Sequence, residues 1–358
     1  MIKKVKEVSY RKISRISPSQ FYSMRNCAYK MVLAEAFEKK PLLPASPNAY
    51  LGTVLHKVLE MTINGIIKNK IDFDKAFDEH IIFEEERLIK DGYAFFVPLR
   101  NNVLNLGIKK ILLLKHLKST SQIPNNSNKK MTAFTERWLE SDNKKIAGKV
   151  DLITEEAGHV QITDFKTGRI TEEVADNTGA LVFDIKSEYK HQMKLYAYLY
   201  YEQSGQWPNQ LVLADLTKQK FSVEFTAQEC TTVYEEAIEL LRLTNECIET
   251  KTFSADPSPK KCGCCLYRPG CSFYLEHLKA DYSFQDVIGV ITSVVRYLNG
   301  NVTVLLHNKD IPITITSFPR EEYDEFNKRK GKQISIFNVK KEKADFLFSA
   351  SKKTIIYE

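Results

Sequence analysis

The chain has 358 residues, of which 43% are hydrophobic and 27% charged, and its formal net charge is +7. This composition excludes a disordered or collagen-like chain and predicts a soluble globular protein with one large core or two smaller ones. No apolar run approaches the roughly 20 residues that a membrane-spanning helix needs, so we expect no membrane segment. The moderate positive charge permits a polyanionic partner such as nucleic acid without demonstrating one.

The N-terminal residues are basic, but no apolar core or cleavage site follows them. A secretory signal is therefore not expected, and the predicted location is the cytoplasm. Cysteines stay reduced in that compartment, so the cluster near Cys262 favours metal or cluster ligation over disulfides.

The first predicted helix carries start signals at three positions. Ser17 suits the N-cap, Pro18 the first helical position, and Gln20 the position three residues after the cap. Cys27 then lies on this helix or just after it.

Helical spacing continues through the N-terminal part of the chain. Residues 51–60 have apolar positions at helical intervals, which predicts that His56 lies on a helix. Residues 73–117 predict two or three more helices, and a polar loop over 119–130 follows them.

The hydrophobic period then changes from that of a helix to that of a strand. Three alternating runs separated by short turns predict a three-stranded meander, followed by a helix, a strand pair and a long amphipathic helix. The meander strands are expected over 132–139, 145–154 and 159–167, and the helix that follows them over 189–203. The strand pair is expected over 211–215 and 221–225, and the long amphipathic helix over 227–250.

A domain boundary is predicted near Asp281, which gives a first domain over 1–281 and a small β-rich domain over 282–358. Five strands and a short helix in the second domain resemble a small OB-like β-barrel in number and order. The strands are expected over 287–296, 301–306, 311–316, 333–339 and 353–357, and the helix over 320–328.

The second domain also contains many basic residues close to aromatic ones. Phe337 and Phe346 lie near them, which would suit a groove for single-stranded nucleic acid that combines charge with stacking. A solvated charged face is the equal alternative. The basic residues are Lys328, Arg329, Lys330, Lys332, Lys340, Lys341 and Lys343.

Two acids and a lysine fall on adjacent strands of the meander. Asp164 and Lys166 are two residues apart and so point to one face, and Asp151 lies near the end of the preceding strand. Hard oxygen ligands suit Mg²⁺ or Mn²⁺, and an adjacent ammonium can orient water and offset phosphate charge. Taken alone, an Asp-x-Lys pair is more often a solvated strand face.

Four motifs in order resemble the RecB-like branch of the PD-(D/E)XK nuclease superfamily, which includes the AddB nuclease domain and the CRISPR-associated adaptation nucleases. They are Gly52 to His56, Gly148 to Asp151, Asp164 to Lys166, and Gln192 to Tyr196. The resemblance implies an α/β fold with a restriction-endonuclease-like core, in which helices flank a central mixed sheet.

The same resemblance implies roles for these residues. His56, Asp151 and Asp164 would ligate the metal together with the backbone carbonyl of Phe165, and Lys166 would serve the attacking water. Gln192 and Tyr196, one helical turn apart, would position the lysine or the scissile phosphate. Glu136, on the strand before Gly148, is a weaker candidate for the site.

Cys262, Cys265 and Cys271 form a C-x2-C-x5-C spacing, and Cys27 is the candidate fourth thiolate. Soft thiolates suit both zinc and an iron–sulfur cluster. The resemblance implies a 4Fe-4S cluster held by one N-terminal and three C-terminal cysteines, and structural zinc is the alternative. Because Cys264 is adjacent to Cys265, the sequence leaves open which of the two is the ligand.

The expected function is that of a Mg²⁺- or Mn²⁺-dependent deoxyribonuclease. The resemblance implies an exonuclease on single-stranded DNA or DNA ends, in repair, recombination, CRISPR adaptation or phage defence. A catalytically silent DNA-binding subunit of a larger complex and an RNA nuclease are the alternatives.

Overall fold

The computed structural model describes residues 2–120, 131–175, 179–281 and 283–358. They form two compact units, which are described separately. The first, here called the sheet unit, comprises Ile13–Asn26 and Ser46–Glu246, and the second, the cysteine unit, comprises Met1–Lys12, Cys27–Ala45 and Cys247–Glu358. The predicted domain boundary near Asp281 falls inside the cysteine unit and stays a prediction.

A five-stranded mixed sheet forms the centre of the sheet unit. The predicted meander is confirmed, because β1, β2 and β3 pair antiparallel in sequence order, while β3 pairs parallel with β6 and β6 antiparallel with β7. These strands are β1 (Met131–Glu140), β2 (Ala147–Glu156), β3 (His159–Lys166), β6 (Gln210–Asp215) and β7 (Lys220–Ser222).

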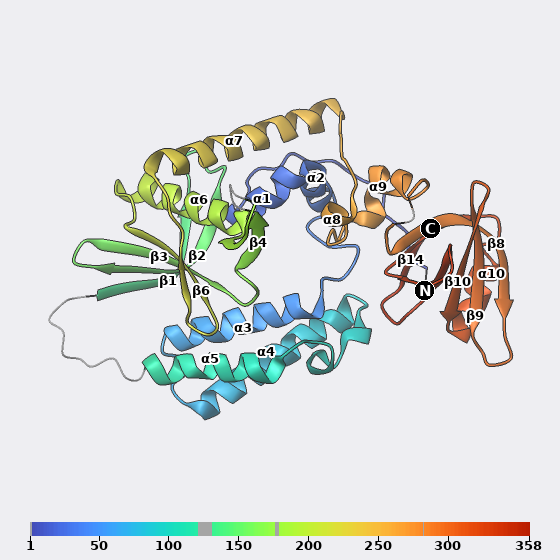
Figure 1. Ribbon diagram of the computed structural model, residues 1–358, viewed down its shortest axis with the longest axis horizontal. Helices are drawn as coiled ribbons and strands as arrows, with labels where there is room; N and C mark the ends of the chain where they lie inside the picture. Colours follow the sequence, from blue (N-terminus) through green and yellow to red (C-terminus); the bar gives the residue numbers. More distant parts are fainter. Residues whose placement is uncertain (1, 121–130, 176–178, 282) are drawn as a thin grey trace. The chain divides into compact units, whose positions relative to one another are not determined.

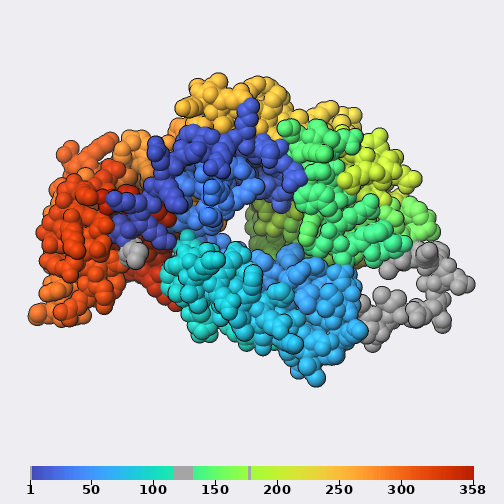
Figure 2. Space-filling view, turned by 180° about the vertical axis from the view of Figure 1, so that it is seen from behind, coloured from blue at the N-terminus to red at the C-terminus, as the bar shows by residue number. Residues whose placement is uncertain are grey.

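Helices pack on this sheet as the α/β prediction requires. Helix α6 contacts β1, β2, β3 and β6, and α1 packs on α6, whereas α3 contacts β1 and packs against α4 and α5 (Figure 1). In the space-filling view, α3 and α4 form one continuous mass of blue to cyan atoms (Figure 2). The helices are α1 (Pro18–Asn26), α3 (Pro47–Ile63), α4 (Lys70–Lys90), α5 (Leu106–Thr120), α6 (Ser187–Ser204) and α7 (Ala227–Thr250), with short 3-10 turns at Ala94–Phe96 and Leu99–Asn101.

Local capping explains where the site-bearing helices begin and end. The Gln20 side chain accepts a hydrogen bond from the backbone N–H of Ser17 at 2.9 Å, as expected for half of a capping box. Ser46 caps α3 by accepting from the N–H of Ala49. Helix α6 ends at Gly205, whose φ of 72° is the left-handed conformation that glycine adopts without strain.

One hairpin was not predicted from the sequence. Strands β4 (Thr171–Ala175) and β5 (Leu181–Ile185), which follow β3 and precede α6 in the chain, form a separate two-stranded sheet. The charged residues Glu172 and Glu173 hide the alternation that marks a strand. Helix α5 extends into the predicted polar loop, whose residues 121–130 lie outside the described residues.

The C-terminal part of the cysteine unit is a curled seven-stranded sheet in the order β12-β13-β10-β9-β8-β11-β14. All five predicted strands and the helical segment are confirmed, and the short strands β12 and β13 are additional. The elements are β8 (Asp286–Arg296), β9 (Val302–Asn308), β10 (Ile311–Phe318), a 3-10 turn (Arg320–Glu322), α10 (Tyr323–Asn327), β11 (Gln333–Phe337), β12 (Lys340–Lys341), β13 (Leu347–Ser349) and β14 (Ile355–Tyr357).

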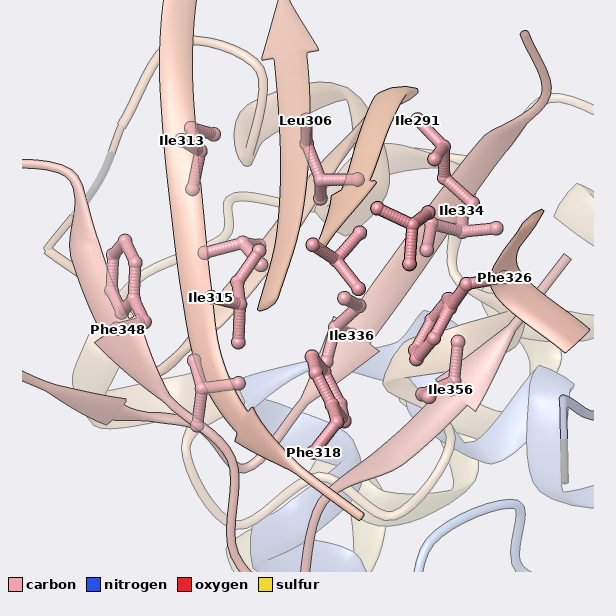
Figure 3. Close-up of a cluster of buried hydrophobic side chains, with 14 of the residues drawn as sticks. Ile291, Leu306, Ile313, Ile315, Phe318, Phe326, Ile334, Ile336, Phe348 and Ile356 are labelled. Carbon is pink, nitrogen blue, oxygen red and sulfur yellow. The ribbon is translucent and has the colours of Figure 1, made fainter. Parts of the chain in front are cut away.

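Isoleucine, leucine and phenylalanine side chains from these strands and from α10 fill the concave side of the sheet (Figure 3). The remaining helices of the cysteine unit are α2 (Ala28–Ala36), α8 (Pro259–Cys262) and α9 (Ser272–His277), with a 3-10 turn at Arg268–Gly270. Among the described residues, no helix is long and apolar enough to cross a membrane.

The C-terminal sheet does not expose Phe337, one of the two aromatic residues of the predicted stacking surface. Phe337 is fully buried and packs against the ring of Tyr357, so it is not available to stack on a base. Arg329 and Lys332 both form ion pairs with Glu358. Part of the predicted basic surface is therefore already neutralised within the sheet.

Candidate active site

The first motif residue, His56, lies on α3 and faces an open cleft of about 560 Å³ in the sheet unit. Gly52 and Thr167 line the same cleft, and a Cβ at Gly52 would lie 3.3 Å from the hydroxyl oxygen of Thr167. A Cβ at this position would press on the Thr167 side chain, so that either this side chain or α3 would have to shift. The glycine of the first motif thus lets the histidine helix lie close to the sheet.

Asp151 reaches the site where the pairing between β2 and β3 ends. The ladder stops at Leu152 and Thr163, while β2 continues along β1 and β3 continues along β6. Beyond that point the Asp151 carboxylate accepts a 2.6 Å hydrogen bond from the backbone N–H of Phe165. The side chain of one strand therefore replaces a backbone partner of the next.

Asp164, Lys166 and Gln192 form a connected set of polar contacts. The Lys166 ammonium lies 2.7 Å from Asp164 Oδ2 and donates a 2.9 Å hydrogen bond to Gln192 Oε1. The Gln192 amide donates in turn to Asp164 Oδ1 at 3.0 Å. The ring of Tyr189 packs 4.4 Å from Lys166 Nζ. One glutamine thus orients both the acid and the lysine.

Tyr196, the second member of the helical motif, contacts the backbone of β2. Its hydroxyl donates to the carbonyl oxygen of Lys149 at 2.7 Å, whereas Gln192 makes the contact to the lysine. A Cβ at Gly148 would lie 2.9 Å from Pro18 Cδ and 3.4 Å from the Tyr196 ring. This close packing explains why glycine stands three residues before Asp151.

Burial dominates the electrostatics of the site. Burial, together with the neighbouring Asp164 carboxylate, raises the pKa of Asp151 to about 7. Burial also lowers the pKa of His56, which favours the neutral imidazole that ligates metals. The site is therefore short of positive charge for its two carboxylates.

The residues brought together fit a hard divalent cation in their chemistry. Two carboxylates and a neutral imidazole are the donors in question, and His56 Nδ1 lies 3.9 Å from Asp151 Oδ2. Asp164 Oδ2 is buried, and the Lys166 ammonium lies 2.7 Å from it. As they stand, the described side chains contain no group of three or more His, Cys, Asp or Glu that could hold a metal ion.

Glu136 is the acid that the sequence signalled only weakly. It lies on β1 between Thr135 and Arg137, which pair with Leu152 and Val150 of β2. Glu136 lines the same cleft as Asp151 and pairs with Lys149 at 2.7 Å. Its φ of 52° is unusual for a residue other than glycine. The strand pattern predicted its position but not this backbone conformation.

In the cysteine unit, one pocket is lined by Cys27, Cys262, Cys265 and Cys271 together. Cys264 is exposed and does not line it. Burial raises the pKa of the Cys262 and Cys265 thiols and raises that of Cys271 to about 12. Thiophilic metal ions suit such a donor set, and binding would release the thiol protons.

Comparison with known proteins gives one family. The family model of the PD-(D/E)XK nuclease superfamily matches residues 15–272 of the chain. This range spans all four motifs and the cysteines from Cys27 to Cys271. No curated protein matches the chain significantly.

Solved structures give only distant likenesses. One is described as "Crystal structure of SSO0001", with 13% identity, a TM-score of 0.28, and coverage of 74% of this chain and 89% of the other. Another is described as "Structure of murine DNA binding protein bound with ds DNA", with 6% identity, a TM-score of 0.18, and coverage of 64% and 97%. At these TM-scores neither structure supports an argument about this chain.

We predict that Asp151→Asn stabilises the metal-free sheet unit at pH 8. The folded carboxyl has a pKa of about 7 against an ordinary 3.8, so it keeps its proton at pH values where the unfolded chain has lost it. Its contribution to stability thus falls as pH rises through this interval and is fully unfavourable above pH 7. Urea unfolding with a chelator present is expected to show a gain on the order of 1 to 3 kcal/mol at pH 8 that disappears near pH 4.

The matched control is Glu156→Gln, which makes the same carboxylate-to-amide change at an exposed end of β2. It is expected to leave the pH dependence of unfolding unchanged. An Asp151→Asn protein less stable than wild type at pH 8 would contradict the assignment of Asp151 as an electrostatically unfavourable group.

Gly148→Ala is expected to destabilise the protein by about 1 to 3 kcal/mol, because the added methyl group meets Pro18 and Tyr196 in a packed interior. Gly168→Ala is the control, since a Cβ there has no heavy atom within 4 Å. Thermal unfolding of both variants measures the difference, and equal melting temperatures would show that β2 can shift to accept the methyl group.

Proposed function

Because the chain belongs to the PD-(D/E)XK nuclease superfamily, we propose that it is a metal-dependent deoxyribonuclease of the RecB-like branch. The reaction is hydrolysis of phosphodiester bonds in single-stranded DNA or at DNA ends, in exonuclease mode. The observation that carries the proposal is the contact set in which Gln192 bridges Asp164 and Lys166.

A silent subunit has no chemical need for a lysine held beside two carboxylates. Lys166 is 15% exposed and Asp164 6%, so both groups are desolvated and their interaction is strong. Asp151 is held to the same strand through the Phe165 N–H. This costly arrangement supports catalysis over the non-catalytic alternative.

The proposed ligands of a Mg²⁺ or Mn²⁺ ion are His56, Asp151, Asp164 and the backbone carbonyl of Phe165. When bound, such an ion supplies a Lewis acid that offsets phosphate charge and makes water a better nucleophile. Lys166, oriented by Gln192, contributes a fixed positive charge beside the attacked phosphate and orients the water. Tyr196 keeps β2, and with it Asp151, against α6.

We further propose that Cys27, Cys262, Cys265 and Cys271 hold a 4Fe-4S cluster, with zinc as the alternative. The shared pocket of these four residues supports the assignment over one that includes the exposed Cys264. A cluster would tie α2 to the segment after α7 and stabilise the cysteine unit. The resemblance to RecB-like nucleases supports a role in DNA repair, recombination, CRISPR adaptation or phage defence.

Lys166→Met is expected to reduce Mn²⁺-activated cleavage of labelled single-stranded DNA by about 10²-fold or more, because it removes a positive charge placed at the reacting phosphate. Binding measured by fluorescence anisotropy is expected to change little. Lys145→Met, an exposed lysine of the same unit, is the control and is expected to cleave like wild type. Cleavage retained in Lys166→Met would contradict the proposal.

The same assay is run on linear DNA with a 5′ or 3′ block, on circular single-stranded DNA, and on RNA of the same sequence. Cleavage of linear but not circular DNA is expected for an exonuclease. Faster cleavage of RNA would favour the RNA nuclease alternative.

Protein purified without oxygen is expected to be brown with broad visible absorbance, since iron–sulfur charge transfer gives this colour. Cys27→Ser and Cys271→Ser are expected to lose the absorbance and the iron, while Cys264→Ser keeps both. Colourless protein with stoichiometric zinc would replace the cluster by the zinc alternative, and loss of iron in Cys264→Ser would overturn the ligand assignment.

A further inference from the structure

Arg268, between Cys265 and Cys271, is a buried arginine whose contacts go to the cysteine segment and to the C-terminal sheet. Its guanidinium Nη1 donates to the backbone carbonyl oxygens of Cys262, Gly263 and Cys265, at 3.2, 2.8 and 2.9 Å. Three carbonyls of one short segment thus converge on a single nitrogen. An arrangement of this kind fixes the backbone of the segment from inside.

The other side of the guanidinium is anchored in the C-terminal sheet. Arg268 Nε donates to Asp286 Oδ2 at 2.7 Å, and Nη2 donates to the Asn338 side chain at 3.2 Å. Asp286, the first residue of β8, also accepts from the Tyr274 hydroxyl at 2.6 Å and from the N–H of Asn338 at 2.8 Å. The side chains of Arg268 and Asp286 are only 7% and 3% exposed.

We propose that Arg268 is a positioning residue that holds residues 262–265 in the conformation in which Cys262 and Cys265 line the four-cysteine pocket, with Asp286 of β8 as its anchor. The C-terminal sheet then forms part of the cysteine site. The ligand is a thiophilic metal ion or cluster, and in this respect the inference rests on the proposed function.

The geometry favours this role over that of an ordinary buried ion pair. A pair that only stabilised the fold would need one carboxylate partner, and Asp286 supplies it. The three carbonyl contacts add nothing to charge neutralisation, but they set the backbone that carries two of the four cysteines. Arg268 and Tyr274 line the pocket as well, so the positioning groups lie next to the thiols.

The test compares Arg268→Met, Asp286→Asn and the double variant with wild type, as full-length protein purified without oxygen. Arg329→Met is the matched control, because Arg329 forms ion pairs with Glu325 and Glu358 in the same unit. The first measurement is the rate at which a chelator removes iron or zinc from the chain. The second is the melting temperature.

Arg268→Met is expected to lose metal at least about tenfold faster than wild type, as is typical when the groups that orient metal ligands are removed. Asp286→Asn is expected to change in the same direction and to be the least stable variant, because it leaves a buried guanidinium unpaired. The double variant is expected to recover most of the melting temperature without recovering metal retention. Metal retention that returns together with stability in the double variant, or that is unchanged in Arg268→Met, would overturn the proposal.

A third measurement separates this inference from the proposed cluster. Alkylation of each cysteine in metal-free protein is followed by mass spectrometry, with the exposed Cys264 as internal reference. Cys265 is expected to react on the order of tenfold faster in Arg268→Met than in wild type, because the segment opens more often. If wild-type protein is purified without bound metal and Cys265 still reacts faster in Arg268→Met, the cluster is rejected and the positioning role is kept. If Cys265 reacts equally fast in both proteins, the positioning role alone is rejected.

Discussion

The hydrogen bond from the Phe165 N–H to the Asp151 carboxylate is the interaction on which the candidate active site depends. Pairing between β2 and β3 ends just before it, so backbone groups of both strands need other partners. Asp151 satisfies the amide of Phe165, and Tyr196 satisfies the carbonyl of Lys149. Two residues of the family motifs therefore close the gap in the sheet, and the site forms at the gap.

The separation of the strands also determines the charge balance of the site. It lets two carboxylates from neighbouring strands approach each other in a buried place, which raises the pKa of Asp151. Lys166 offsets one of them, and Gln192 fixes the lysine in that position. A deficit of positive charge remains beside a neutral histidine, which is the condition under which a divalent cation binds favourably. The charge deficit that lowers the stability of the metal-free fold would favour the cation that we propose to bind there.

The sequence predicted the elements whose hydrophobic period or capping residues are set by their own segment of the chain. The meander and the helix carrying His56 follow from hydrophobic period, and the start of α1 follows from its cap. The β4–β5 hairpin was missed because its exposed strands carry charges such as Glu172 and lack a buried face. The burial of Phe337 was missed because β11 is buried at successive positions on both faces, which an alternating pattern does not indicate.

The limits at the candidate sites have a different cause. Spacing predicted that Gln192 and Tyr196 share one face of a helix, but their partners depend on where β3 and β2, respectively, lie against α6. Arg268 had no signal of its own, since a single arginine among cysteines is unremarkable in sequence. Its role follows from carbonyl groups that converge only after the segment folds. The motifs named Asp151 and Tyr196 but not the backbone groups that these side chains bind, and they gave no sign of Arg268, because contacts from side chain to backbone are set by the folded chain.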